Sequence, residues 1–157
     1  MDKIHLRYPD ESDLEFLKAI ELNPENKIFS KNDELLNEDV LLAYLHSEQN
    51  IKKFDQIRWI IVSEENKTGI IDLYDADFIN KTAFIGIIIQ KEYRNNGHAK
   101  KALMLLEKMA IKNDISTLFA EVLIVNFAGL SLFRSLDYLP VKSSGHESII
   151  LRKTLKY

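Results

Sequence analysis

Residues 84–98 read FIGIIIQKEYRNNGH, and this stretch decides how the middle of the chain folds. The apolar run at 84–90 predicts a buried β-strand, because short continuous runs of β-branched residues are typical of strands covered on both faces. Apolar residues at helical spacing then predict an amphipathic helix over 98–112. Gly97 separates the two predicted elements, and its role is the first question that the sequence raises.

A helix that begins at the carboxyl end of a buried strand leaves its first backbone N–H groups without partners, and it carries a partial positive charge there. That end attracts an anion, and a glycine lets the backbone approach a phosphate where a Cβ would obstruct it. With Arg94 adding charge, the turn suits a phosphate or pyrophosphate. A plainer alternative stays open: Gly97 makes only a tight turn, His98 is a surface residue, and the lysines that follow form a solvated helix face.

The composition narrows the class of protein. The chain has 157 residues, of which 46% are apolar, and fits one domain spanning 1–157. Its formal charge of −3 comes from 21 basic and 24 acidic residues spread along the chain, so neither a nucleic-acid nor a membrane partner is expected. There is no cysteine, and the four histidines lack ligand spacing, so no metal is expected either. No apolar stretch suits a signal peptide or a membrane span, and we expect a cytoplasmic protein.

The hydrophobic patterns predict an α/β fold with a mixed sheet covered by helices. Strands are expected at 4–8, 57–63, 70–75, 84–90, 118–125, 138–141 and 147–153, and helices at 9–22, 32–47, 98–112 and 127–136. A turn is expected across 63–69. Strands run together in the middle of the chain and alternate with helices later, so a purely parallel dinucleotide fold is not predicted. The GxGxxG fingerprint of nicotinamide sites is absent as well.

Two motifs carry a resemblance to a known family. The order R-x-x-G-x-A at 94–99 resembles the coenzyme A loop of the GNAT family of N-acetyltransferases, Q/R-x-x-G-x-G/A. Downstream, the family places an Asn after its fifth strand, a small residue three positions later and a Tyr seven later, where this chain has Asn126, Gly129 and Phe133. The segment 57–103 looks like the polyamine and ribosomal-protein N-terminal acetyltransferase branches.

The resemblance implies a fold, a cosubstrate and a binding site. It implies a mostly antiparallel sheet that is splayed between its fourth and fifth strands and flanked by about four helices. It also implies acetyl-CoA, with the pantetheine arm in the gap, direct transfer of the acetyl group to a primary amine of a small molecule or a protein N-terminus, and a possible homodimer. The residues that would bind the cosubstrate are Ile87, Ile88 and Ile89 through their backbone, Arg94, Asn95, Asn96, Gly97, His98, Ala99 and Lys100 in the turn, and Asn126 and Phe133 beyond the fifth strand. On its own, an Asn after a strand is usually a helix cap, and Asn126 can serve both purposes.

The chain departs from the family where the chemistry takes place. Phe133 replaces the tyrosine that protonates the departing sulfur in relatives, and Phe84 lies where the polyamine branch commonly carries a glutamate. A thiol has a pKa near about 8.5, so a thiolate leaves with little help. Candidate catalytic residues are Asp72, Asp75 and Glu121 as bases and Tyr74 as an acid, each of which can also be only a strand-edge side chain.

These departures support a second hypothesis, a coenzyme A-binding module that has lost catalysis. A third hypothesis is an interaction domain in which the glycine turn is only structural. Acidic residues Glu34, Glu38, Asp39 and Glu48 would suit a cationic acceptor or serve only solubility. The acidic Trp-Phe-Glu-Glu-Pro stretch typical of polyamine enzymes is absent, so polyamine specificity is not predicted.

Overall fold

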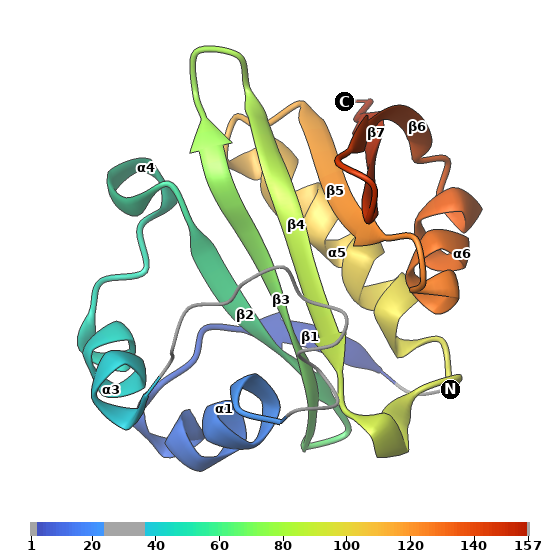
Figure 1. Ribbon diagram of the computed structural model, residues 1–157. Helices are drawn as coiled ribbons and strands as arrows, with labels where there is room; N and C mark the ends of the chain where they lie inside the picture. The colour runs from blue at the N-terminus through green and yellow to red at the C-terminus, as the bar shows by residue number, and fades with distance from the viewer. Residues whose placement is uncertain (1–2, 24–36, 157) are drawn as a thin grey trace.

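The computed structural model describes residues 3–23 and 37–156. Its centre is a seven-stranded sheet in the order β1-β2-β3-β4-β5-β7-β6 (Figure 1). The strands are β1 Ile4–Arg7, β2 Ile57–Ser63, β3 Asn66–Asp77, β4 Thr82–Ile89, β5 Thr117–Leu123, β6 Leu139–Ser144 and β7 Ser148–Thr154. All neighbours are antiparallel except β4 and β5, which are parallel, so the predicted mixed sheet is confirmed.

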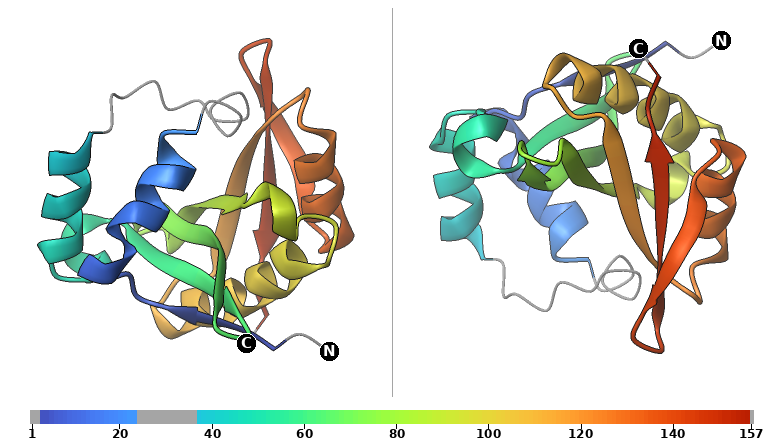
Figure 2. Two further views of the ribbon diagram at one scale, coloured as in Figure 1. Left: turned by 90° about the horizontal axis from the view of Figure 1, so that it is seen from below. Right: turned by 90° about the horizontal axis from the view of Figure 1, so that it is seen from above.

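Helices cover both faces of this sheet. In the described part of the chain they are α1 Leu14–Glu21, α3 Glu38–His46, α4 Ile51–Phe54, α5 His98–Lys112 and α6 Phe127–Ser135, with short 3-10 turns at η1 Glu11–Asp13 and η2 Lys91–Tyr93. Figure 2 shows α1 and α3 on one side of the sheet and α5 and α6 on the other. We call these two sides the α1/α3 face and the α5/α6 face.

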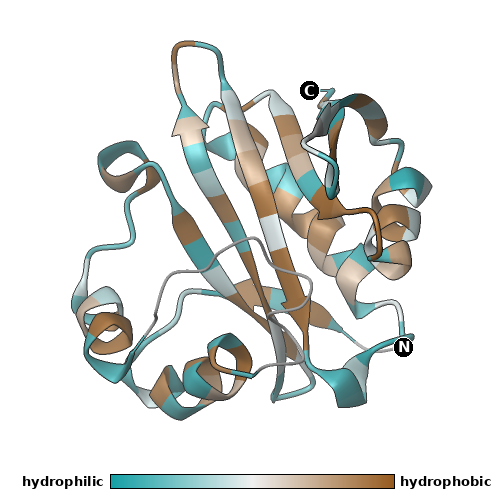
Figure 3. Ribbon diagram, viewed as in Figure 1, coloured by the Kyte–Doolittle hydropathy of each residue, from teal (hydrophilic) through white to brown (hydrophobic). Residues whose placement is uncertain are grey.

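Two hydrophobic cores follow from this arrangement. On the α1/α3 face, Leu17 and Leu41 belong to a buried cluster that includes Ile70 of β3. On the α5/α6 face, Leu103 of α5 belongs to a larger cluster that includes Ile71 of β3. Successive strand residues point to opposite faces, so neighbouring Ile70 and Ile71 of β3 enter the two different cores. Figure 3 shows hydrophobic residues along the central strands.

The sheet is splayed between β4 and β5, as the family resemblance implied. The two strands pair only through Thr82↔Thr117, Ala83↔Leu118 and Phe84↔Phe119. Beyond Phe84, β4 continues to Ile89, and beyond Phe119, β5 continues to Leu123, so the two arms diverge (Figure 1). Because the strands are parallel, their carboxyl ends lie at the same edge of the sheet, and α5 and α6 begin beyond that edge.

The turn predicted across 63–69 is confirmed as the hairpin turn between β2 and β3, but it is shorter than predicted. The strand β3 already begins at Asn66, and the turn consists of Glu64 and Glu65, whose φ angles are 49° and 81°. Two-residue hairpin turns of this kind favour Asn and Gly, so a Glu-Glu pair gives no turn signal in the sequence.

Smaller differences concern other element ends. The short helix α4, capped by the Asn50 side chain, was not predicted, because four residues are too few for a helical period. β5 begins one residue earlier and ends two residues earlier than predicted, and β6 begins one residue later and extends to Ser144. The second predicted helix is described as α3, and the earlier part of its predicted range, 32–36, lies outside the described residues.

Candidate active site

The turn between β4 and α5 contains two residues in the left-handed region, Asn95 at φ 65° and Gly97 at φ 78°. Gly97 is the N-cap of α5, where no side chain caps the helix and no acidic residue occupies the first turn. Among the described residues, a Cβ built on Gly97 would meet nothing within 4 Å, so none of them fills the space in front of Gly97. The Arg94 side chain folds back, its Nε donating to the carbonyl of Ile89 at 2.9 Å. The predicted turn residues therefore surround an open, uncapped helix N-terminus.

His98 is buried rather than exposed, so its interpretation as a surface residue is wrong. Only 3% of the residue is accessible. Its ring stacks on Tyr93, with ring centroids 6.0 Å apart. The neighbouring Ala99 packs against the core of the α5/α6 face, which holds the first turn of α5 close to the sheet. Whether a single histidine is buried or exposed cannot be predicted from its position in the sequence.

Asn126 lies on the other arm of the splay, directly before α6. Its Oδ1 accepts a hydrogen bond from the backbone N–H of Gly129 at 2.9 Å, so the predicted helix cap is confirmed. A Cβ on Gly129 would come within 2.7 Å of the Asn126 amide nitrogen, so the glycine leaves room for the cap. The same amide nitrogen can donate a further hydrogen bond.

Gly86 brings two of the predicted catalytic residues together where the splay begins. On the α1/α3 face, a Cβ built on Gly86 would lie 3.5 Å from Oδ2 of Asp72 and 3.7 Å from Cε1 of Tyr74. Gly86 is the Cα partner of Asp72, two residues after Phe84. Asp72 and Tyr74 therefore lie within van der Waals distance of the position that a side chain at residue 86 would occupy, beside the last paired residues of β4 and β5.

Asp72 is held by an arginine that sequence reasoning missed. Arg58 of β2 donates from Nε to Oδ1 at 2.7 Å and from its NH2 group to Oδ2 at 2.8 Å. The same guanidinium is ion-paired with Glu21 and lies over the ring of Tyr44. Burial alone would lower the pKa of Arg58, but Asp72 and Glu21 raise it above its usual value, so the cation is fixed. A charged residue between buried Ile57 and Trp59 was the available sequence signal for such a partner.

The other acidic candidates differ in their surroundings. Asp75 is exposed, and it lies at a break in the pairing of β3 with β4. Glu121 of β5 is half-buried, and its Oε1 accepts a hydrogen bond from the buried Ser148 hydroxyl at 3.0 Å. Burial raises the pKa of Tyr74 to about 12, with further contributions from Glu121, Asp75 and Asp72 in that order. Tyr74 therefore stays protonated at neutral pH.

Phe133 lies in the core of the α5/α6 face. Its exposed fraction is 4%, and its ring meets Tyr138 edge-on, with ring centroids 5.2 Å apart. The side chain thus extends from α6 and packs against Tyr138 in the loop that follows the helix.

The sequence matches one known family of proteins over most of its length. Residues 3–138 match the model of the acetyltransferase (GNAT) domain. The chain belongs to the GNAT acetyltransferase family. No curated protein matches the sequence. Among the described residues, no group of three or more acidic or histidine side chains could hold a metal ion, and no described helix is long and apolar enough to cross a membrane.

Several solved structures share this fold at low sequence identity. A domain from Methanocaldococcus jannaschii is 23% identical, with a TM-score of 0.80, over 99% of this chain and 100% of that one. Spermidine N-acetyltransferase from Vibrio cholerae, in complex with CoA and spermine, is 15% identical, with a TM-score of 0.83, over 96% and 95%. The acetyltransferase from Salmonella typhimurium that modifies the N-terminal serine of ribosomal protein L7/L12 is 17% identical, with a TM-score of 0.78, over 98% and 95%.

Proposed function

We propose that the protein is an acetyl-CoA-dependent N-acetyltransferase that moves the acetyl group directly to a primary amine of a small molecule or a protein N-terminus. The observation that carries this proposal is the splay between β4 and β5, with the open, uncapped start of α5 beyond it. The solved complex of spermidine N-acetyltransferase with CoA and spermine supports it.

The chain offers three kinds of contact to coenzyme A. Backbone N–H groups at the start of α5 would hold the pyrophosphate, with Lys100 adding positive charge. The diverging part of β4, which includes Ile87, Ile88 and Ile89, would pair with the pantetheine arm through its backbone. The Asn126 amide nitrogen would donate to the same arm from the other side of the splay.

Acetyl transfer then needs a base, a polarised carbonyl and a leaving thiolate. The amine nitrogen bonds to the thioester carbon, the C–S bond breaks, and the amine proton leaves to a base. Glu121 is best placed for that proton, because Asp72 is engaged by Arg58 and Asp75 is exposed. Tyr74, protonated at neutral pH, would supply the proton that the sulfur takes up. Backbone N–H groups of β4 would polarise the carbonyl.

The test of coenzyme A binding is a matched pair of glycine variants. Gly97 and Gly145 both have positive φ, at 78° and 65°, and a Cβ at either would meet nothing within 4 Å. Asp is equally strained at both, so Gly97→Asp and Gly145→Asp should cost similar stability. Only Gly97→Asp places a carboxylate where the pyrophosphate would lie. Calorimetry should therefore show at least a hundredfold weaker acetyl-CoA binding for Gly97→Asp alone. Equal binding by both variants would refute the proposed cradle.

A coenzyme A-binding module without catalysis is the second candidate. It is favoured by Phe84 and Phe133, which place rings where relatives carry a glutamate and a tyrosine. Thiol release from acetyl-CoA separates the two candidates, with polyamines, amino sugars, amino acids and N-terminal peptides as acceptors. Release with any of these supports the enzyme, whereas binding without release supports the module.

We also propose a homodimer formed through β6. This strand is at the edge of the sheet, and Leu139 and Val141 on it are 68% and 40% exposed. An exposed edge with apolar side chains favours pairing with a second chain. The spermidine N-acetyltransferase of Vibrio cholerae is dodecameric in a solved structure. Light scattering at micromolar concentration should give about twice the chain mass of 18.2 kDa, and a mass equal to one chain would contradict the dimer.

A further inference from the structure

Asn96 and Gly97 form the only Asn-Gly pair in the sequence. In such a pair the backbone nitrogen of the glycine can attack the side-chain amide carbon of the asparagine, because no Cβ on the glycine obstructs the approach. The new C–N bond closes a succinimide ring, and the amide nitrogen leaves as ammonia with the backbone proton. Water then opens the ring to aspartate or isoaspartate. The net change replaces the side-chain NH2 group with OH, and the resulting carboxyl group is ionised at neutral pH.

The structure leaves both reacting groups accessible. Asn96 and Gly97 are exposed. Within residues 3–23 and 37–156, no hydrogen bond engages the Asn96 side-chain amide or the backbone N–H of Gly97. That N–H has no partner because Gly97 is the N-cap of α5, and the first N–H groups of a helix have no carbonyl one turn earlier. The two groups therefore have no such hydrogen bond to break before they react.

The start of α5 also favours the charges that develop in this reaction. The glycine nitrogen must lose its proton, and the tetrahedral intermediate at the amide carbon carries an oxyanion. Both negative charges form at the amino end of a 15-residue helix, which has a partial positive charge. No acidic residue lies between Tyr93 and Leu106, whereas Arg94 and Lys100 are cationic. The features that suit a pyrophosphate therefore also promote deamidation of Asn96.

Two other asparagines in exposed turns lack one or more of these conditions. Asn95 is exposed, but the residue after it is Asn96, whose Cβ obstructs the attack. Asn80, in the turn between β3 and β4, is followed by Lys81, and its amide nitrogen donates to Oδ2 of Asp77 at 2.7 Å. Asn95 and Asn80 therefore serve as internal references for the rate at Asn96.

We propose that Asn96 is a site of spontaneous deamidation and that the carboxylate formed there weakens binding of acetyl-CoA. The effect on binding rests on the proposed acetyltransferase function, whereas the modification itself does not. A carboxylate at this position adds a negative charge beside the helix start where the pyrophosphate would lie, and isoaspartate also inserts a methylene group into the backbone before α5. Bound acetyl-CoA occupies the same helix start and slows the reaction. The protein therefore loses cosubstrate affinity with age when it is empty and is protected when it is loaded.

The modification is measured by mass spectrometry, without an activity assay. Protein without ligand would be kept at about pH 8 for several days, and its tryptic peptide 95–100 compared with that of fresh protein digested in parallel. We expect Asn96 to deamidate at least about tenfold faster than Asn95 or Asn80, because only Asn96 precedes a glycine. The rate should be lower at about pH 6, because the attacking nitrogen must lose its proton. Equal rates at the three asparagines would overturn the proposed site.

Calorimetry then tests the effect on binding. Asn96→Asp should bind acetyl-CoA at least about tenfold more weakly than the unmodified protein, because the added charge repels the phosphates. The matched control is Asn80→Asp, which adds the same charge at the turn between β3 and β4 and should keep the affinity. Asn96→Ser has no side-chain amide, so its affinity should be the same before and after ageing. Saturating acetyl-CoA should slow deamidation of the unmodified protein at least about threefold.

The outcomes separate this inference from the function on which it rests. Full affinity in aged protein whose Asn96 is modified would overturn the effect on binding, and an equal loss of affinity in aged Asn96→Ser would do the same. An unchanged rate with saturating acetyl-CoA would overturn the protection. Absence of acetyl-CoA binding in fresh protein would overturn the proposed function, and the mass measurement would still test the modification.

Discussion

Phe133 shows how one residue can depart from its family's pattern and still fit the fold. Its ring is 96% excluded from solvent, since 4% is exposed, and Tyr138 covers one edge. A thiolate needs a proton less than an amine or alkoxide leaving group does, so losing the tyrosine hydroxyl at this position need not stop transfer. The Phe133 ring then contributes to the packing of the core on the α5/α6 face.

Substitutions at Phe133 should separate packing from proton delivery. Phe133→Tyr should change turnover by less than about tenfold, equivalent to about 1.4 kcal/mol in barrier, measured by thiol release with the accepted amine. Phe133→Ala removes a buried ring and should lower the free energy of unfolding by about 3–5 kcal/mol while raising the KM for acetyl-CoA. A gain of a hundredfold or more in Phe133→Tyr would show that proton delivery limits the natural protein.

For single residues, the sequence predicts contacts within one helical turn but not contacts between neighbouring strands. The cap at Asn126 follows from an Asn before a helix and a Gly three residues later, all within one turn. The pairing of Arg58 with Asp72 depends instead on the register of β2 and β3. The two-residue turn at Glu64 and Glu65 and the register shift between Ile61 and Val62 together set that register, and neither has a clear signal in the sequence.

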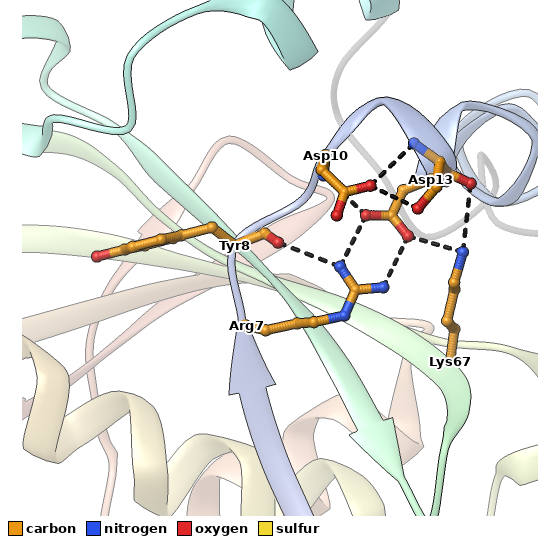
Figure 4. A network of polar contacts seen from close by, with 6 residues as sticks. Arg7, Tyr8, Asp10, Asp13 and Lys67 are labelled. Carbon is orange, nitrogen blue, oxygen red and sulfur yellow. Dashed lines mark hydrogen bonds and ion pairs between the residues drawn. The ribbon is translucent and has the colours of Figure 1, made fainter.

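At the scale of elements, a buried carboxylate joins the first strand and helix to the third strand. Asp13 of η1 is ion-paired with Arg7 of β1 at 2.8 Å and with Lys67 of β3 at 2.7 Å, and it accepts the Asp10 backbone N–H at 2.8 Å (Figure 4). Its side chain is 0% exposed. Burial alone would raise the pKa of Asp13, but the hydrogen bonds from Arg7, Lys67 and the Asp10 backbone hold it well below its usual value.

This lowered pKa gives a pH-dependent contribution to stability. Because the folded-state pKa is below the unfolded value of about 3.9, the contribution is fully present above about pH 5 and is lost as the pH falls below about 4. Asp13→Asn should lower the free energy of unfolding by about 3 kcal/mol at pH 7, and the difference should shrink at pH 3. Asp114→Asn is the control, because its pair with Lys52 is exposed and should contribute less than about 1 kcal/mol. Denaturant titration that shows the same deficit for Asp13→Asn at both pH values would contradict this account.

The long elements were predictable because each must bury one face. α1, α5 and α6 follow the helical period of their apolar residues. α5 has its expected range and α6 ends one residue early, whereas α1 begins at Leu14, five residues after the expected start, because η1 precedes it. β3 was predicted too short, since Asn66 and Lys67 are polar and carry no strand signal of their own. They extend the strand because they pair with Ser63 and Val62 of β2.

At the scale of the whole molecule, the order of the last strands could not be deduced from pattern. A closing pair of strands was expected, but either strand of such a pair can be placed next to β5 by the hydrophobic pattern alone. In the structure β7 pairs with β5 along seven residues, and β6 takes the edge. The splay between β4 and β5 was likewise implied by family resemblance rather than by period, because Ile87, Ile88 and Ile89 look like an ordinary buried strand.

The splay predicts how the molecule as a whole responds to ligand. The diverging parts of β4 and β5 do not pair with each other, so a ligand that contacts both arms and the α5 turn should stabilise the sheet. At one hundred times its dissociation constant, acetyl-CoA should add about 2.7 kcal/mol to the free energy of unfolding. For a domain of this size that raises Tm by about 5–11 °C, measurable by calorimetry. Adenosine diphosphate reaches only the turn, so at the same concentration it should raise Tm by less than half as much. Gly97→Asp should abolish both increases in Tm, whereas the control variant Gly145→Asp should retain them. Equal increases in Tm for the two ligands in the unmodified protein would show that the splay takes no part in binding.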